Sequence, residues 1–278
     1  MKALFDQVAV ETSQNVTKTY STSFFKSVST LDSSIRDDVH AIYGMVRFAD
    51  EIVDTFHEYD KAVLLDEFKA DTYKSIERGI SLNPILNSFQ ATVNKYNIDI
   101  QLIDQFFYSM EMDLNPVEYS KELYDKYIVG SAEVVGLMCL KIFVEGDDNT
   151  YNELKYYASK LGAAFQKINF LRDLKDDWEG LGRVYFPEIV EEEFTHKQKL
   201  EIEKDIEADF QEAYKGVLLL PKTCRFSVYL AYTYYYKLLI KIKNKEVNEL
   251  MTARIRIPNY SKMFIYFRSY MAHSLNML

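Results

Sequence analysis

Apolar residues recur every three or four positions along most of this 278-residue chain, which is the spacing of one face of an α-helix. Between residues 35 and 53, the apolar stripe consists of Ile35, Val39, Ile42, Tyr43, Val46, Ala49, Ile52 and Val53. The same period runs through residues 98–112, 122–144, 150–177, 196–214 and 224–243. No segment alternates convincingly between apolar and polar residues, so the pattern predicts helices and no sheet.

Residues that break helices are scarce. The chain has nine glycines and five prolines, and it contains no linker rich in Gly, Ser or Pro. The prolines fall near expected helix starts or joints, at Pro84, Pro116, Pro187, Pro221 and Pro258. We therefore expect an all-α fold of about ten helices, with residues 1–278 forming a single domain.

The charge balance and the cysteines narrow the class of protein. Asp and Glu number 42 against 33 Lys and Arg, a net charge of −9, whereas nucleic-acid binding needs a basic face. We therefore expect no nucleic-acid partner. Cys139 and Cys224 are isolated and form no CxxC motif, which favours a reducing cytoplasm. No run approaches the ~18 apolar residues of a transmembrane helix, and the first residues show no secretory signal pattern.

A group of lysines near residue 240 leaves two interpretations open. Lys237, Lys241, Lys243 and Lys245 fit either a solvated helix face or a peripheral contact with an anionic membrane. Because the cysteines favour the cytoplasm and these lysines leave a membrane contact open, we expect the protein in the cytoplasm, including the membrane surface.

Two pairs of aspartates carry the most specific chemical signal. Asp50 and Asp54 form the first pair, and Asp173 and Asp177 form the second. Each pair is spaced i, i+4, so on a helix both carboxylates share one face. Such like charges repel, and they are costly within apolar segments unless a cation lies between them. Carboxylates on two facing helices are suitable ligands for magnesium with a bound diphosphate.

Polar residues beside the two pairs strengthen this interpretation. Arg47 lies three residues before the first pair and on the same helix face. Arg172 directly precedes the second pair, so it should point about 100° around the helix. Asn169 lies one turn before the second pair and offers an amide oxygen, with Gln166 near the same stripe. The four histidines show no HExxH spacing, so a zinc site is not expected.

The motifs around these pairs carry a resemblance to a known family. The first reads Asp50-Glu51-Ile52-Val53-Asp54. The second reads Gln166-x-x-Asn169-x-x-Arg172-Asp173-x-x-Asp176-Asp177, followed by Gly182-Arg183-Val184-Tyr185-Phe186-Pro187. Both resemble the signatures of the squalene/phytoene synthase family, with the closest likeness to bacterial phytoene synthases. The resemblance extends over essentially the whole chain.

Other segments match the family less uniformly. The segment from Tyr20 to Phe24 resembles its N-terminal diphosphate-contacting segment, and 127–138 resembles its glycine-interrupted central helix. Glu133 stands where a small residue is expected, which questions the local width of the pocket. Tyr236 and Ile240 replace the arginine and aspartate of the late motif.

The resemblance implies an isoprenoid-synthase helical bundle around a central apolar cavity. It implies Mg²⁺, with Mn²⁺ as a substitute, bound by Asp50, Asp54, Asn169, Asp173 and Asp177. It implies substrate contacts from Ser21, Phe24, Tyr43, Arg47, Gln166, Arg172, Tyr235 and Arg254, with Arg256 as the alternative to Arg254. The four aspartates and Tyr127 are the expected catalytic residues, although Tyr127 fits a proton-transfer role and a structural one equally well.

The implied reaction is the head-to-head condensation of two geranylgeranyl diphosphates to phytoene, by way of a cyclopropyl diphosphate. This is the 15-cis-phytoene synthase reaction of carotenoid biosynthesis, a prenyl transfer that uses no NADPH. Because its product has no polar group, we expect the enzyme to work at a membrane surface without spanning it.

Three alternatives remain. A synthase acting on farnesyl diphosphate would make squalene or dehydrosqualene. A non-catalytic relative could serve as an assembly or lipid-binding factor, although such a protein would be expected to lose motif carboxylates. A plain helical scaffold with surface acid is the third. A head-to-tail synthase is disfavoured because its first motif should read DDxxD.

Overall fold

The computed structural model describes residues 1–115, 119–181, 183, 185–187, 189, 194–252 and 254–274, without the side chains of 178–181, 259 and 272–274. Every regular element in these ranges is helical, which confirms the predicted all-α class. The elements are α1 (Lys2–Tyr20), α2 (Thr22–Val28), α3 (Ser33–Thr55), α4 (Lys61–Arg78), α5 (Pro84–Tyr96), α6 (Ile100–Met112), α7 (Lys121–Ile128), the π-helical turn η1 (Val129–Glu133), α8 (Val134–Phe143), α9 (Asp148–Leu181), α10 (His196–Leu219), α11 (Lys222–Lys243), α12 (Val247–Leu250) and α13 (Asn259–Ser274).

The six periodic segments of the sequence correspond to α3, α6, the run α7–η1–α8, α9, α10 and α11. The helices that the periodicity did not single out include α1 and α4. Their buried faces are rich in small and hydroxyl side chains, such as Ser13 and Thr17 on α1 and Thr72 and Ser75 on α4. An apolar stripe is therefore weak in these helices, although they pack against the rest of the fold. The prediction that residues 1–278 form one domain stays a prediction.

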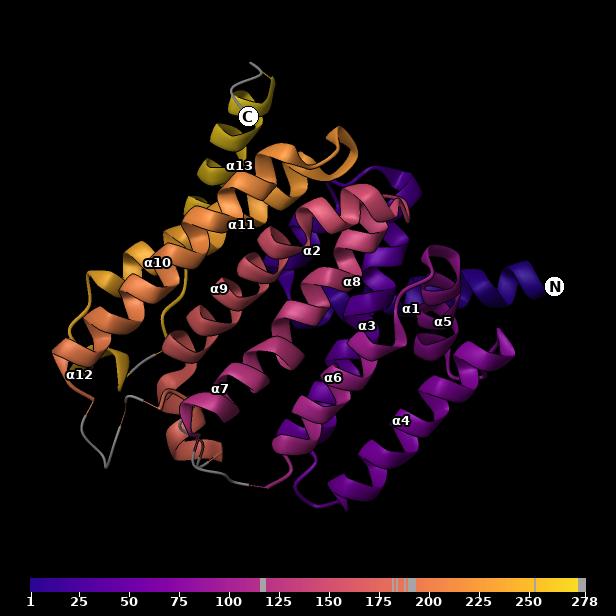
Figure 1. Ribbon diagram of the computed structural model, residues 1–278, viewed down its shortest axis with the longest axis horizontal. Coiled ribbons are helices and arrows are strands. Elements are labelled where there is room, and N and C mark those ends of the chain that lie inside the picture. Colours follow the sequence, from indigo (N-terminus) through magenta and orange to yellow (C-terminus); the bar gives the residue numbers. More distant parts are fainter. Residues whose placement is uncertain are drawn as a thin grey trace.

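The helices form a bundle in which the two halves of the chain lie on opposite sides. In Figure 1, α4, α5 and α6 occupy one side, α10 and α11 occupy the other, and α8 and α9 run between them. The short helix α2 lies against α11, so the N-terminal region also reaches the C-terminal side. Helices α3 and α9, which carry the two aspartate pairs, therefore both contribute to the middle of the bundle.

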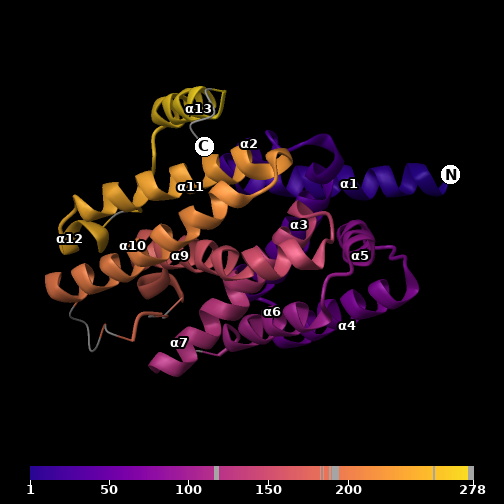
Figure 2. The ribbon, with the colours of Figure 1, turned by 45° about the horizontal axis from the view of Figure 1, so that its top comes forward.

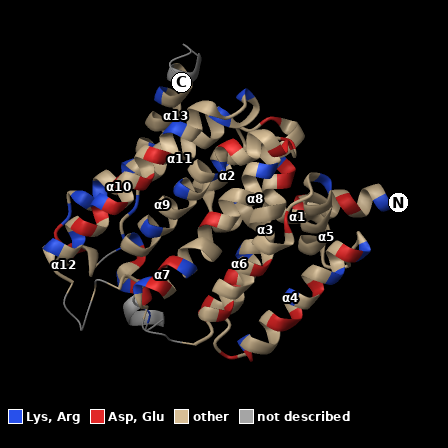
Figure 3. Cartoon of the chain, in the orientation of Figure 1, with Lys and Arg blue, Asp and Glu red and all other residues tan. Residues whose placement is uncertain are grey.

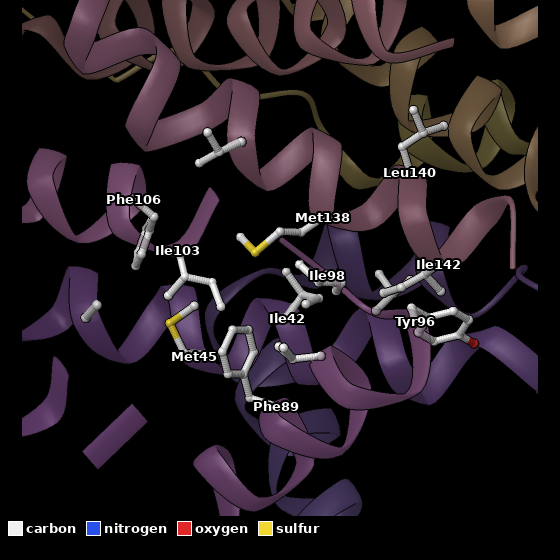
Figure 4. Packing of buried hydrophobic residues seen from close by; sticks show 14 of the residues in the cluster. Ile42, Met45, Phe89, Tyr96, Ile98, Ile103, Phe106, Met138, Leu140 and Ile142 are labelled. Atoms are coloured by element: carbon white, nitrogen blue, oxygen red, sulfur yellow. The ribbon is translucent and has the colours of Figure 1, made fainter. Parts of the chain in front are cut away.

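Two large clusters of buried apolar side chains hold these helices together. The first joins α3, α5, α6 and α8, with Met45, Phe89, Phe106 and Met138 at its centre (Figure 4). The second lies around α7, α9, α10 and α11. Burying a side chain of this size contributes about 1.5–3 kcal/mol, so the clusters fix the positions of α3 and α9.

Local signals set where several helices begin. The Asp32 carboxylate accepts a hydrogen bond from the backbone N–H of Ser34 at the start of α3. Asn83 caps α5, whose first residue is Pro84. Among the described helices, none combines the length and the apolar character that crossing a membrane requires.

Glycines allow the central helices to approach closely. A Cβ atom added to Gly162 of α9 would lie 2.6 Å from the backbone oxygen of Ala132 in η1. A Cβ atom added to Gly136 of α8 would lie 2.9 Å from the backbone oxygen of Ala158 in α9. Because backbone atoms cannot move aside as side chains do, these contacts require glycine.

We predict that Gly162→Ala destabilises the protein by about 1–3 kcal/mol, because the added methyl group forces η1 and α9 apart. The change would otherwise favour the helix by about 1 kcal/mol. Urea denaturation measures the free energy of unfolding. Lys155→Ala, at an exposed position of the same helix, is the control and should have little effect. Equal stability of wild type and Gly162→Ala would contradict the close approach.

Candidate active site

A cavity of about 900 Å³ lies within the bundle. This volume is at the upper end of the ~300–1,000 Å³ typical of ligand pockets. Its apolar walls come from both halves of the chain and include Phe24, Val39, Val46, Val135, Leu161, Phe165, Val217 and Val228. The cavity therefore offers room for long apolar groups.

The structure brings every predicted site residue to this cavity. Its lining includes Ser21, Phe24, Tyr43, Arg47, Asp50, Asp54, Tyr127, Gln166, Asn169, Arg172, Asp173, Asp177, Tyr235 and Arg254. Arg256 is not among the lining residues, and its backbone oxygen accepts a hydrogen bond from Lys241. Of the two late arginines, Arg254 therefore holds the position that a cavity ligand can reach.

On α3, Arg47 is paired with acidic residues of its own helix. Its guanidinium donates hydrogen bonds to Asp50 and to Glu51, a residue that was not assigned to the site from the sequence. The guanidinium also stacks over the Tyr20 ring at 4.5 Å. Its Nε is buried and makes no hydrogen bond to the described residues.

On α9, two arginines converge on one carboxylate. Arg172 Nε lies 2.9 Å from Asp173 Oδ1, and Arg254 Nε lies 2.7 Å from the same oxygen. The 100° offset expected between Arg172 and Asp173 does not separate them, because the long arginine side chain folds back along the helix. Both guanidinium groups offer the planar fork that recognises phosphate oxygens.

An amide side chain of α9 is linked to α11 at the cavity wall. Asn169 Nδ2 donates to Gln166 Oε1 at 3.3 Å, and the Tyr235 hydroxyl donates to Asn169 Oδ1 at 3.4 Å. The Tyr235 ring stacks on Phe165 with 3.9 Å between the centroids. The amide group of Asn169 is therefore held between two neighbours at the cavity wall.

The two aspartates within each pair repel each other, as their i, i+4 spacing predicts. The pKa of Asp50 is raised to about 7, chiefly by burial and next by the charge of Asp54, against the opposing effect of Arg47. Burial likewise raises the pKa of Asp177 to about 7, with further contributions from Asp173 and Asp54. The effect of Asp54 on Asp177 acts between α3 and α9, so the two helices bring negative charge to a common region.

The residues fit a magnesium–diphosphate complex better than a metal ion alone. Within the described ranges, no three carboxylate, His or Cys side chains are gathered closely enough to form a metal site. Magnesium, however, is usually held by one or two carboxylates, with water and substrate phosphates completing its shell. Two carboxylate pairs match this type of site, since each has one member with a raised pKa, Asp50 and Asp177, and arginines lie beside both pairs.

Three residues outside the predicted set complete the network. Arg183 Nη1 lies 2.8 Å from Asp54 Oδ1, and its Nη2 donates to the backbone oxygen of Asp113 at 2.6 Å. The Asp113 carboxylate accepts hydrogen bonds from the hydroxyls of Tyr127 at 2.6 Å and Tyr185 at 3.2 Å. Arg183 and Tyr185 belong to the second family motif, whereas no spacing signal marks Asp113, which directly follows α6.

This network keeps the Tyr127 hydroxyl protonated. Burial is the main cause that raises the pKa of Tyr127 well above its ordinary value, and the negative charge of Asp113 adds to it. Burial also raises the pKa of Asp113 to about 6, while Arg183 opposes this. The Tyr127 hydroxyl is therefore a hydrogen-bond donor in this structure, held by a carboxylate at the cavity wall.

Other residues that the sequence analysis singled out do not line the cavity. Glu133 does not line it; burial raises the pKa of Glu133, and the nearby Lys160 lowers it. The Glu133 side chain therefore does not narrow the cavity. Lys243 pairs with Glu207 and Lys245 with Glu249, each at 2.6 Å. The side chain of Trp178 and the residues Pro116, Gly182 and Val184 lie outside the described residues.

We predict that Asp177→Asn raises the melting temperature of the metal-free protein by several degrees at pH 8. The pKa of Asp177 is about 7 in the folded protein and about 3.8 when unfolded, so its contribution lowers stability as the pH rises from 4 to 7. The gain should therefore shrink at pH 5. Thermal unfolding with a chelator, at both pH values, measures it.

Asp66→Asn, at an exposed position of α4, is the matched control and should leave the melting temperature unchanged at either pH. A loss of stability in Asp177→Asn at pH 8 would contradict the repulsion between the pairs.

Comparisons with known proteins agree with this geometry. A family model for squalene/phytoene synthase matches residues 17–261. Phytoene synthase 1 of Solanum lycopersicum is 29% identical over 250 residues, which cover 82% of this chain and 59% of that protein. The 4,4'-diapophytoene synthase of Staphylococcus haemolyticus is 26% identical over 68% of this chain and 66% of its own length.

A crystal structure of a dehydrosqualene synthase in complex with ligand has the same fold, with a TM-score of 0.79, 18% identity, and coverage of 97% of this chain and 98% of that one. The fold, the paired aspartates and the sequence match over most of the chain lead to one conclusion: the protein belongs to the squalene/phytoene synthase family.

Proposed function

We propose that this protein is a prenyltransferase that condenses two geranylgeranyl diphosphates head to head, forming phytoene for carotenoid biosynthesis. One observation carries the proposal: two carboxylate pairs and their arginines lie at a large cavity with apolar walls. The substrate has the matching construction, a charged diphosphate joined to a long apolar chain.

Binding would begin with the charged residues. Arg47, Arg172 and Arg254 are paired with carboxylates in the structure. Bound Mg²⁺ would supply positive charge at the diphosphate and assist its departure, with Asp50, Asp54, Asn169, Asp173 and Asp177 as the residues to hold it. The arginines are then free to donate hydrogen bonds to phosphate oxygens and stabilise charge on the leaving group.

The apolar walls would protect the cations that follow. Departure of diphosphate from one substrate leaves an allylic cation, which the double bond of the second substrate attacks, and loss of a proton from the resulting cation closes the ring of a cyclopropyl diphosphate. Departure of the second diphosphate and rearrangement of the ring then give a cation that loses a proton to form phytoene. Residues such as Phe24, Phe165 and Leu161 exclude water that would otherwise trap these cations. Tyr127 and the departing diphosphate are the groups placed to accept the final proton. The hydrogen bond from Tyr127 to Asp113 favours diphosphate as the acceptor.

A second candidate is a synthase that uses farnesyl diphosphate and makes dehydrosqualene or squalene. The diapophytoene synthase relative is the observation in its favour. A non-catalytic role is less consistent with the site, because all four motif aspartates are retained at the cavity.

Incubation with geranylgeranyl or farnesyl diphosphate, with Mg²⁺ and with or without NADPH, tests these candidates. Mass analysis should identify phytoene from the longer substrate, regardless of NADPH. Dehydrosqualene from farnesyl diphosphate alone, or squalene that requires NADPH, would transfer the assignment to the second candidate. Absence of diphosphate release from both substrates would overturn the enzymatic proposal.

We predict that Asp173→Asn lowers turnover at least about a hundred-fold at saturating Mg²⁺, since Asp173 is one of the carboxylates that would hold Mg²⁺ at the diphosphate. Circular dichroism should show an unchanged helical fold. Asp66→Asn serves again as the control and should retain full turnover. Near-normal turnover in Asp173→Asn would remove this residue from the site.

We also predict that Arg47→Lys lowers kcat/KM by about ten-fold or more, because lysine keeps the charge but lacks the planar fork. Arg78→Lys, at the exposed end of α4, should have no effect. Steady-state kinetics with both variants measures the difference. Equal kcat/KM in wild type and Arg47→Lys would show that charge alone suffices.

A further inference from the structure

The cavity is long, and helix α9 forms one side of it. The α9 residues that line it recur at helical spacing and include Leu154, Ala158, Leu161, Phe165, Asn169 and Asp173. At about 1.5 Å of rise per residue, Leu154 and Asp173 lie about 28 Å apart along the helix. Figure 2 shows α9 between α10 and α11 on one side and α6 on the other. The cavity therefore has carboxylates at one end and apolar side chains at the other.

Two close contacts show which residues lie opposite each other in the apolar half. A Cβ atom added to Gly136 of α8 would lie 2.9 Å from the backbone oxygen of Ala158. A Cβ atom added to Gly216 of α10 would lie 2.2 Å from the Cβ atom of Tyr157. All four residues line the cavity. We call the part of the cavity that they line the deep segment.

Helices α8 and α10 lead from the deep segment away from the aspartates. The two glycine contacts between the central helices show that α8 runs antiparallel to α9. Helix α10 is also antiparallel to α9, because Lys167 pairs with Asp209 at 2.6 Å whereas Tyr157 meets Gly216. Each further turn of α8 and α10 therefore lies farther from the aspartates of α9.

Three leucines close the apolar end of the cavity. Leu140 and Leu220 lie one turn beyond the glycines of the deep segment, and Leu154 lies one turn beyond Ala158. Each leucine lines the cavity and is at most 6% exposed. Figure 3 shows α8 as largely uncharged, whereas α4 and α10 carry many charged positions. The deep segment is therefore an apolar space with a fixed end.

The length of a prenyl chain decides whether it reaches the deep segment. An extended carbon chain advances about 1.2 Å per bond, as does a protein backbone that spans about 3.5 Å per residue of three bonds. A farnesyl main chain of about 12 carbons therefore extends ~13 Å, and a geranylgeranyl main chain of about 16 carbons extends ~18 Å. Magnesium and a phosphate oxygen add about 5 Å before the first carbon, since each Mg–O bond is about 2.1 Å long.

The two chains end at different levels of α9. Measured from Asp173, a farnesyl chain ends after ~18 Å, at Leu161, and a geranylgeranyl chain ends after ~23 Å, between Ala158 and Tyr157. The fourth isoprene unit thus occupies the deep segment, which a farnesyl chain leaves empty. An apolar space that is left empty loses the contacts that a filled one makes.

We propose that Ala158, with Gly136 and Gly216, makes the cavity deep enough for a geranylgeranyl chain, and that Ala158 determines the preference for this chain over farnesyl. The inference rests on the proposed function, because it requires a prenyl diphosphate held at the aspartates. Ala158 is the member of this set that can be enlarged, since both glycines lie too close to their neighbours to accept a Cβ atom.

Binding of two unreactive analogues tests the proposal without turnover. Titration calorimetry with Mg²⁺ measures the affinities for geranylgeranyl and farnesyl thiodiphosphate. Wild type should bind the geranylgeranyl analogue at least about ten-fold more tightly. Ala158→Phe should weaken binding of this analogue by about a hundred-fold, because its ring fills the deep segment. Binding of the farnesyl analogue should stay within about three-fold of wild type, so the preference reverses.

A second variant and a control accompany this measurement. Val135→Phe, at a cavity-lining position next to Gly136, fills the same part of the cavity from α8 and should also reverse the preference. It provides a second test if circular dichroism shows that Ala158→Phe does not fold. Ala62→Phe, at an exposed position of α4, is the matched control and should retain both affinities.

Equal affinity of wild type for the two analogues would overturn the proposal, as would an unchanged preference in both cavity variants. Product analysis separates this outcome from a failure of the proposed reaction. Absence of diphosphate release from both natural substrates, with a preference that Ala158→Phe reverses, would overturn the reaction and support the role of Ala158. Phytoene formation by wild type, with an unchanged preference in the variants, would support the reaction and overturn the role of Ala158.

Discussion

Repulsion among carboxylates at one cavity is the constraint around which this protein is arranged. Asp50 and Asp54 reach the cavity from α3, and Asp173 and Asp177 reach it from α9. Their charges are offset by four arginines, Arg47, Arg172, Arg183 and Arg254, each within ion-pair distance of one of the aspartates. The pKa values of Asp50 and Asp177 nevertheless lie near 7, chiefly because these carboxylates are buried and secondly because neighbouring aspartates repel them. Such a site is most stable with cations bound.

The rest of the fold holds α3 and α9 in place against this repulsion. The apolar cluster that joins α3 to α5, α6 and α8 fixes the first aspartate pair. The close contact between Gly162 and the backbone of η1 fixes α9 near the middle of the bundle. Arg183, which follows α9, also links that helix to the N-terminal half of the chain. Its guanidinium bonds to Asp54 of α3 and to the backbone of Asp113 after α6. The charged site is therefore a consequence of packing that lies outside it.

The sequence identified residues that line the cavity better than it identified the complete set of helices. The i, i+4 spacing of the aspartates requires only a helix, so their placement on shared faces follows from local geometry. Helix α1 was not singled out, because Ser13 and Thr17 replace large apolar residues on its buried face. Asp113 was not identified, because its role arises from contacts with Tyr127 and Arg183 that are far apart in sequence. Long-range contacts of this kind leave no periodic pattern.

Helix α13 illustrates a further limit of the periodic pattern. Phe264 and Phe267 have the spacing of a core-facing helix, yet they face solvent while Ile265 faces α11. Periodicity identifies which residues share a face, but only the packed structure shows which face is covered.

Anomalous diffraction from crystals grown with Mn²⁺ and an unreactive prenyl thiodiphosphate tests the central claim most directly. The account predicts manganese peaks between α3 and α9, within coordination distance of carboxylates from both aspartate pairs and of the diphosphate oxygens. It also predicts that Arg47, Arg172 and Arg254 turn from the carboxylates toward the diphosphate. Manganese bound elsewhere, or a diphosphate held in the cavity with no metal beside either pair, would contradict it.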